Sequence, residues 1–147
     1  MAEPMVDTDT ARSATEVVEA FLRALEQLDI ERAAALLHPD VTYQNVPLPP
    51  ARGKAATVKQ LRFLEKYCSG FQARNHNIAA NGDTVLTERT DVIEVGRFSA
   101  EFWVCGTFEV RDGQVVLWRD YFDYADVTVA MVKGAARALL GRVRGSR

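Results

Sequence analysis

Charged residues stand on the apolar faces of two predicted strands of this 147-residue chain. Side chains alternate between the faces of a strand, so in the segment 84–95 Arg89 and Asp91 share a face with valine and isoleucine. The same counting places Asp120 between two aromatic neighbours, Trp118 and Phe122. An unpaired carboxylate in such surroundings is very costly. We therefore expect Arg89, Asp91 and Asp120 to meet as one ionic cluster inside a pocket.

Two further polar residues, Tyr43 and Asn45, lie two positions apart in another predicted strand and share a face. A water molecule held by this phenol, this amide and the carboxylate of Asp120 would have the few polar partners that a buried water requires. Asp120 could take the proton of the water, while Asp91, kept protonated by apolar surroundings, donates to an oxygen across the substrate. With Arg89 as a bridge, this arrangement suits the opening of an epoxide to a diol. The residues alone leave open which aspartate is the acid and which is the base.

Helical spacing of apolar residues, capping residues and turn residues predict the elements that must position this cluster. In the first part of the chain we expect a helix from Ser13 to Leu28, a short helix from Asp29 to Leu37, a turn at 38–40, a strand at 41–46, an extended proline-rich segment at 47–50 and a helix at 54–68. Alternation with a period of two then predicts four antiparallel strands between Phe71 and Tyr124. A last helix, capped by Asp126, is expected to end at Gly141.

This order of elements predicts an α+β fold: a curved mixed, mainly antiparallel β-sheet with helices packed on its concave face. It resembles the cystatin-like cone of the nuclear-transport-factor-2 (NTF2-like) type, in which a cavity lies between sheet and helices. We expect one domain over residues 1–147, with flexible ends at 1–12 and 142–147.

Three segments resemble those of the limonene-1,2-epoxide hydrolases, and they occur in the same order as in that family. They are Tyr43-Gln44-Asn45-Val46-Pro47-Leu48-Pro49-Pro50, Thr87-Glu88-Arg89-Thr90-Asp91-Val92 and Trp118-Arg119-Asp120-Tyr121-Phe122-Asp123. The resemblance implies that Tyr43 and Asn45 position the water, Asp120 is the general base, Asp91 is the general acid and Arg89 bridges the two. It also implies a homodimer built on the outer sheet face. The inward-facing residues themselves predict direct water attack without a covalent intermediate, and we expect neither a cofactor nor a metal ion.

The expected substrate is an apolar terpene, lipid or sterol-like epoxide, which would place the enzyme in lipid metabolism or detoxification. We expect the cavity lining to include four apolar residues: Trp118, Phe122, Leu48 and Phe102. The cavity wall departs from the family at further positions, among them Phe63, Tyr67 and Trp103, so limonene oxide itself is not implied.

Composition excludes several other classes of protein. A formal net charge of −2 is atypical of a nucleic-acid-binding domain. No stretch approaches the roughly 20 apolar residues of a membrane span, and the acidic amino terminus lacks the apolar region of a signal peptide, so a cytoplasmic location is expected. His76 has no neighbours at metal-ligand spacing, so a metal site is not expected. No Gly-x-Ser-x-Gly motif is present, which excludes covalent hydrolysis on an α/β-hydrolase fold.

Two alternatives use the same cone-shaped fold. One is a ketosteroid-isomerase-like or polyketide-cyclase-like enzyme, in which a carboxylate removes a proton from carbon. An arginine between two aspartates counts against it. The other is a non-catalytic carrier of apolar ligands, in which Arg89, Asp91 and Asp120 only stabilise the pocket floor.

Overall fold

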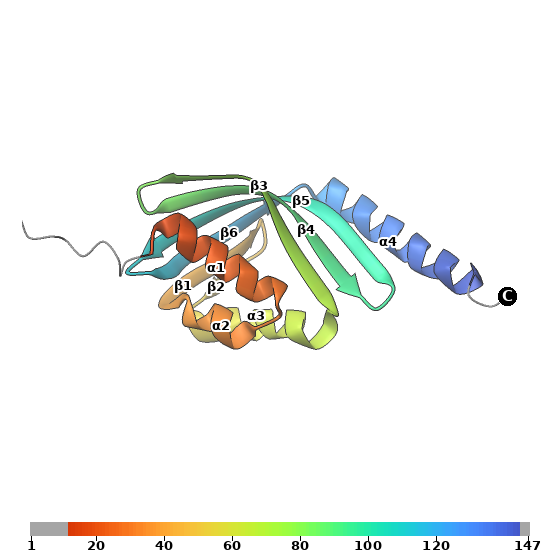
Figure 1. Ribbon diagram of the computed structural model, residues 1–147, viewed down its shortest axis with the longest axis horizontal. Coiled ribbons are helices and arrows are strands. Elements are labelled where there is room, and N and C mark those ends of the chain that lie inside the picture. Colours follow the sequence, from red (N-terminus) through yellow and green to blue (C-terminus); the bar gives the residue numbers. More distant parts are fainter. Residues whose placement is uncertain (1–11, 145–147) are drawn as a thin grey trace, which may run out of the picture.

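The computed structural model describes residues 12–144 (Figure 1). The helices are α1 (Ala14–Glu26), α2 (Ile30–Ala35), α3 (Lys54–Tyr67) and α4 (Tyr124–Arg144). The strands are β1 (Leu37–Val46), β2 (Ala51–Arg52), β3 (Gly70–Asn81), β4 (Thr84–Val95), β5 (Phe98–Arg111) and β6 (Gln114–Phe122). Within this range, no helix combines the length and the apolar character that a membrane span needs.

All the strands belong to one curved sheet with the order β2-β1-β6-β5-β4-β3. The strands β3 to β6 are consecutive antiparallel neighbours and form a meander, which confirms the four predicted antiparallel strands. Their connecting turns contain Gly82, Gly96 and Gly113, each with a positive φ that glycine adopts without strain. Because β1 lies beside β6 and runs parallel to it, the sheet is mixed and mainly antiparallel. This pairing brings the first strand next to the last one, where the predicted site residues lie.

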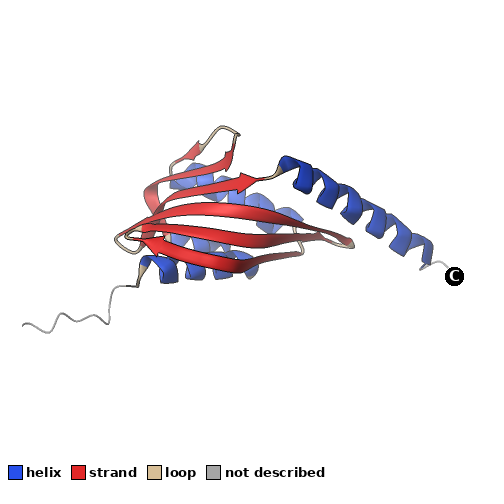
Figure 2. Ribbon diagram, turned by 90° about the horizontal axis from the view of Figure 1, so that it is seen from above, coloured by secondary structure: helices blue, strands red, loops and turns tan. Residues whose placement is uncertain are grey.

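The helices α1, α2 and α3 lie against the concave face of the sheet (Figures 1 and 2). The apolar positions of α1 recur at helical spacing, so one side of the helix is buried in the main core. Phe21 on that side meets Trp118 edge to face, with ring centroids 4.9 Å apart, and Phe108 at 6.4 Å. These contacts fix the helix over the middle of the sheet and pack Phe21 against the Trp118 ring.

The predicted caps of the first two helices are confirmed. The Ser13 hydroxyl accepts a hydrogen bond from the Glu16 backbone N–H at 3.2 Å, and the Asp29 carboxylate accepts one from the Arg32 N–H at 3.1 Å. The predicted turn at 38–40 is wrong, because β1 already begins at Leu37. Leu37 pairs with Val115 of β6, and the register shifts before Thr42. A proline is tolerated at such an irregularity, so His38-Pro39-Asp40 does not break the strand.

The last helix, α4, extends from the end of β6 past the edge of the sheet and packs on β5 (Figure 2). Gly134 lies so close to β5 that a Cβ atom would come within 2.5 Å of the Ser99 carbonyl oxygen. The helix continues past Gly141 to Arg144, so its predicted end is wrong and 142–144 are helical. The remaining predicted flexible segments, 1–11 and 145–147, lie outside the described residues.

The cap of α4 also differs from the prediction. The Asp123 carboxylate, and not that of Asp126, accepts hydrogen bonds from the first backbone N–H groups, at 3.0 Å from Ala125 and 3.3 Å from Asp126. Asp126 instead accepts a hydrogen bond from the Trp103 N–H of β5 at 3.1 Å. Since β6 ends at Phe122, this stretch of β5 needs another acceptor, and Asp126 supplies it.

Candidate active site

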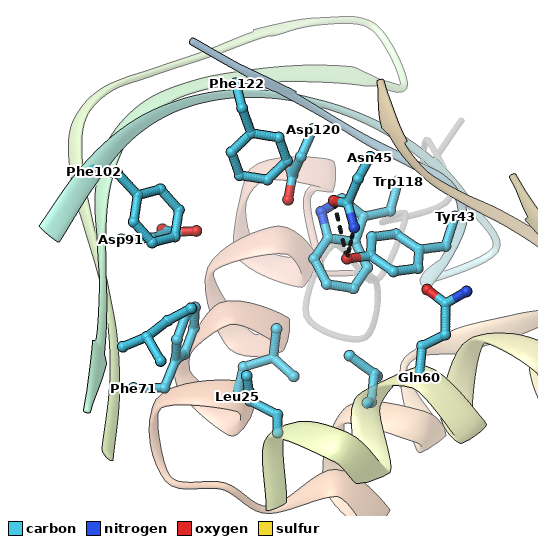
Figure 3. A pocket seen from close by; sticks show the side chains of 13 residues that line it. Leu25, Tyr43, Asn45, Gln60, Phe71, Asp91, Phe102, Trp118, Asp120 and Phe122 are labelled. Carbon is cyan, nitrogen blue, oxygen red and sulfur yellow. Dashed lines mark hydrogen bonds between the residues drawn. The ribbon is translucent and has the colours of Figure 1, made fainter. Parts of the chain in front are cut away.

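A cavity of about 270 Å³ lies between the sheet and the helices α1 and α3 (Figure 3). The strands supply the tyrosine, the asparagine and both aspartates, whereas the helices contribute three leucines and one glutamine. The lining consists of Leu25, Tyr43, Asn45, Gln60, Leu61, Leu64, Phe71, Asp91, Ile93, Phe102, Trp118, Asp120 and Phe122. The cavity is therefore largely apolar, and the polar groups of the sheet are gathered on one wall.

Strand register explains why residues far apart in the sequence meet on this wall. Thr87 of β4 and Asp120 of β6 both pair with Gly106 of β5, so the three residues lie in line across the sheet. On the other side of β6, Asn45 of β1 pairs with Asp120. Tyr43 pairs with Trp118 in the same ladder, and their rings stack at a centroid distance of 4.0 Å.

Arg89 bridges the two aspartates, and all three side chains are buried. Its Nε donates to Asp91 Oδ1 at 2.8 Å, and its Nη2 donates to Asp91 Oδ2 at 3.2 Å and to Asp120 Oδ2 at 2.8 Å. Its Nη1 donates to the hydroxyl of Thr87 at 3.1 Å. The guanidinium therefore spans β5 and joins β4 to β6. The ionic cluster predicted from the alternation pattern is present in the structure.

Burial and mutual attraction act differently on the members of this cluster. Burial disfavours the charge of Arg89, but the attraction of Asp120 and Asp91 outweighs that effect and raises the pKa of the guanidinium. Burial raises the pKa of Asp91 above its ordinary value, although Arg89 opposes this shift. Asp91 thus retains a proton to higher pH than an exposed aspartate does, which is the property a general acid needs.

The other aspartate presents a free oxygen. Asp120 Oδ2 accepts a hydrogen bond from Arg89, whereas Asp120 Oδ1 is buried and has no partner among the described residues. Next to it, the hydroxyl of Tyr43 and the amide of Asn45 hydrogen-bond each other at 2.9 and 3.1 Å. Burial raises the pKa of Tyr43, so the phenol remains protonated and can donate. A carboxylate oxygen, a phenol and an amide therefore lie together, as water activation requires.

The sequence reasoning missed two residues that lie against the Arg89 guanidinium, Gly106 and Thr87. A Cβ at Gly106 would lie 2.5 Å from Arg89 Nη1, 2.7 Å from Thr87 Oγ1 and 3.0 Å from Asp120 Oδ1. Glycine is required here because the guanidinium passes over this point of β5. A glycine inside a predicted strand was the available indication, since it marks a close approach by another group.

Replacing Gly106 by alanine should therefore displace the Arg89 guanidinium and both of its partners. We expect kcat to fall about 100-fold, because misplacement of catalytic groups by about 1 Å has effects of this size. Overpacking of the wall should also lower stability by about 1–3 kcal/mol. The measurement is steady-state kinetics together with thermal unfolding. Gly141→Ala is the matched control, since a Cβ there meets no atom within 4 Å; equal effects of the two changes would contradict this account.

Of the predicted cavity-lining residues, Trp118, Phe122 and Phe102 lie on the cavity, and Leu48 does not. Leu48 is 55% exposed in the turn after β1, where its N–H donates to the Asn45 carbonyl. This turn points the side chain to solvent, whereas the sequence predicted an extended segment at 47–50. Phe63, Tyr67 and Trp103, expected on the cavity wall, are also exposed. Trp103 lies on the opposite face of β5 from Phe102.

Comparison with known proteins gives a consistent result. The family model of the limonene-1,2-epoxide hydrolase (LEH) catalytic domain matches residues 12–136. Epoxide hydrolase EphG of Mycobacterium tuberculosis is 45% identical over 126 residues, which cover 86% of this chain and 81% of that protein. A solved structure of an M. tuberculosis LEH-like epoxide hydrolase superposes with a TM-score of 0.81 at 41% identity, covering 87% of this chain and 96% of the other.

More distant solved structures share the fold alone. One from Shewanella denitrificans, assigned to the SnoaL-like polyketide cyclases, has a TM-score of 0.74 at 11% identity and covers 82% of this chain and 97% of its own. Likeness at this level of identity says nothing about chemistry, since one fold supports many functions. The likeness does show that the curved sheet and its helices form the cone-shaped fold of the NTF2-like and SnoaL-like proteins.

Proposed function

The chain belongs to the limonene-1,2-epoxide hydrolase family and is an epoxide hydrolase, and on that premise we propose that it adds water to an apolar epoxide in one step to give a vicinal diol. Family membership favours an enzyme over the carrier alternative, and the arginine between two aspartates disfavours carbon-acid chemistry. The observation that carries the mechanism is that the two aspartates are hydrogen-bonded differently. Asp120 has a free oxygen, whereas both oxygens of Asp91 contact Arg89 and its pKa is raised.

In the proposed reaction, Asp120 is the general base. Tyr43 and Asn45 hold a water molecule next to Asp120 Oδ1, which takes one proton as the water oxygen attacks an epoxide carbon. The carbon–oxygen bond of the ring breaks in the same step, and no bond forms between substrate and enzyme. General-base assistance of this kind contributes about 10²–10⁴-fold to a rate.

Asp91 is the general acid of the same step. It donates its proton to the epoxide oxygen as that oxygen leaves carbon, so the product is a neutral diol and Asp91 becomes ionised. Arg89 contacts both carboxyl groups. The guanidinium therefore faces one negatively charged carboxylate before and after the step: first Asp120 and then Asp91. Proton exchange with solvent then restores the starting state.

The cavity supports an apolar substrate of modest size. Its volume of about 270 Å³ lies just below the 300–1,000 Å³ typical of sites for drug-sized ligands. A terpene epoxide would be largely enclosed, whereas the chain or ring system of a lipid or sterol epoxide would extend beyond the mouth. Diol formation from epoxides of increasing size tests the substrate class. Failure to hydrolyse any apolar member of such a panel would contradict the proposal.

Because burial raises the pKa of Asp91, the pH dependence of kcat/KM should contain an alkaline limb due to this residue. The acid must be protonated, so activity is present below the raised pKa and is lost as pH rises through it. We expect Asp91→Asn to lower kcat about 10²–10⁴-fold and to remove that limb from the residual activity. Profiles from pH 5 to 9 for both proteins check this. An unchanged limb in the variant would assign it to another group.

The proposal extends to assembly and location. A homodimer through the outer face of the sheet is supported by two exposed apolar residues of that face, Leu86 and Tyr121. Sedimentation of the wild type beside Leu86→Glu tests it, with a monomeric wild type as the contradicting result. Roles in lipid metabolism or detoxification and a cytoplasmic location remain predictions.

A further inference from the structure

Two buried side-chain atoms of the described chain lack a hydrogen-bond partner, and both belong to β6. They are Asp120 Oδ1 and the indole Nε1 of Trp118. Residues two apart in a strand point to the same face, and both of these line the cavity. Trp118 is 4% exposed. Buried polar groups nearly always have a hydrogen-bond partner. A free donor and a free acceptor on the same wall therefore indicate one partner that contacts both of them.

The orientation of the Trp118 ring is fixed by its neighbours. It stacks on Tyr43 and on Phe108, at centroid distances of 4.0 and 6.2 Å, and Phe21 meets it edge to face. In Figure 3 the indole nitrogen lies on the side of the ring toward Asn45 and Asp120. The free N–H is therefore held beside the groups to which the water-holding role is assigned.

We propose that Trp118 Nε1 is a fourth group that holds the reacting water, as a hydrogen-bond donor to its oxygen. This inference rests on the proposed function of the site. An indole N–H donates and does not accept, so it can pair only with a lone pair of the water. One water proton then points to Asp120 Oδ1, and the second points to an oxygen of the Tyr43–Asn45 pair.

This arrangement leaves the water one free lone pair, which is directed into the cavity toward the epoxide. Trp118 transfers no proton. Its contribution is to select, among the orientations that the water could adopt, the one in which attack on carbon and proton transfer to Asp120 coincide. Trp118 therefore acts on the reacting water in addition to lining the cavity.

Trp118→Phe tests this, because it keeps the aromatic ring and removes the N–H. We expect kcat to fall roughly 10-fold, the effect of one hydrogen bond, with KM changed less than about twofold. Trp103→Phe is the matched control, since Trp103 is 43% exposed on the outer face and should be replaceable without effect on rate. A packing role alone for Trp118 would instead raise KM or lower Tm with kcat preserved, and that result would overturn the proposal.

A second measurement does not depend on the variant folding. The wild type should give two indole N–H signals in a ¹⁵N–¹H spectrum, and Trp103→Phe identifies which belongs to Trp118. The Trp118 signal should show a cross-peak to a long-lived bound water, and its absence would overturn the proposal. This contact is independent of how the epoxide opens. If oxygen labelling revealed carboxylate attack while the cross-peak was present, the proposed mechanism would fail and the Trp118–water contact would stand.

Discussion

Asp120→Asn should abolish nearly all epoxide hydrolysis while leaving the protein about as stable as the wild type. An amide cannot take the proton of the attacking water, so we expect kcat to fall about 10³-fold or more. Stability should change by less than about 1 kcal/mol, because Asp91 can ionise in the variant and pair with Arg89 through both of its oxygens. The measurement is diol formation together with thermal unfolding of both proteins.

Asp112→Asn provides the matched control for this change. Asp112 is exposed in the turn between β5 and β6 and has a positive φ, which asparagine also tolerates. It should leave both rate and stability unchanged. If Asp120→Asn lost several kcal/mol of stability and kept most of its activity, Asp120 would be a structural part of the pocket floor and not the base.

Arg89→Met should have the largest combined effect on activity and folding. Methionine fills much of the same space but leaves two buried carboxyl groups facing each other without a cation. Removing one partner of a buried ion pair costs about 3–5 kcal/mol, and loss of the bridge should lower kcat about 10³-fold. The measurements are denaturant unfolding and steady-state kinetics. Arg74→Met is the control, since Arg74 pairs with Glu101 at 3.3 Å with both side chains about half exposed.

The stability of the Arg89→Met protein should also depend on pH in a defined direction. Burial already raises the pKa of Asp91 in the wild type, and without Arg89 nothing opposes that shift. A carboxyl group with a raised pKa in the folded state contributes stability that is lost as pH rises from about 4 through the raised value. The deficit relative to wild type should therefore grow with pH. Adding Asp120→Asn should restore part of the stability and none of the activity; a deficit independent of pH would contradict this reasoning.

Much of the fold follows from local sequence patterns. The capped helices, the four-strand meander and its glycine turns were predicted because each depends on a few neighbouring residues. The errors lie where tertiary contacts decide the outcome. β1 starts at Leu37 despite Pro39 because Leu37 pairs with β6. Asp123 caps α4, because Asp126 accepts a hydrogen bond from the part of β5 that extends beyond the end of β6.

The ionic cluster could be predicted for a different reason. Charge on an apolar strand face is costly, so Arg89, Asp91 and Asp120 had to find one another. Gly106 and the free N–H of Trp118 could not be found in this way, because their importance depends on strand register and on the angle of one ring. Leu48 was misplaced because the turn after β1 directs its side chain outward.

The central claim is that water, and not an enzyme carboxylate, attacks the epoxide. A single turnover in heavy-oxygen water, with enzyme in excess over an apolar epoxide, tests it most directly. Direct attack predicts that the first diol formed carries one heavy oxygen atom and that the protein carries none in its aspartates. An unlabelled first diol, with the heavy oxygen found afterwards in Asp120 or Asp91, would show that a carboxylate had attacked and would contradict the mechanism.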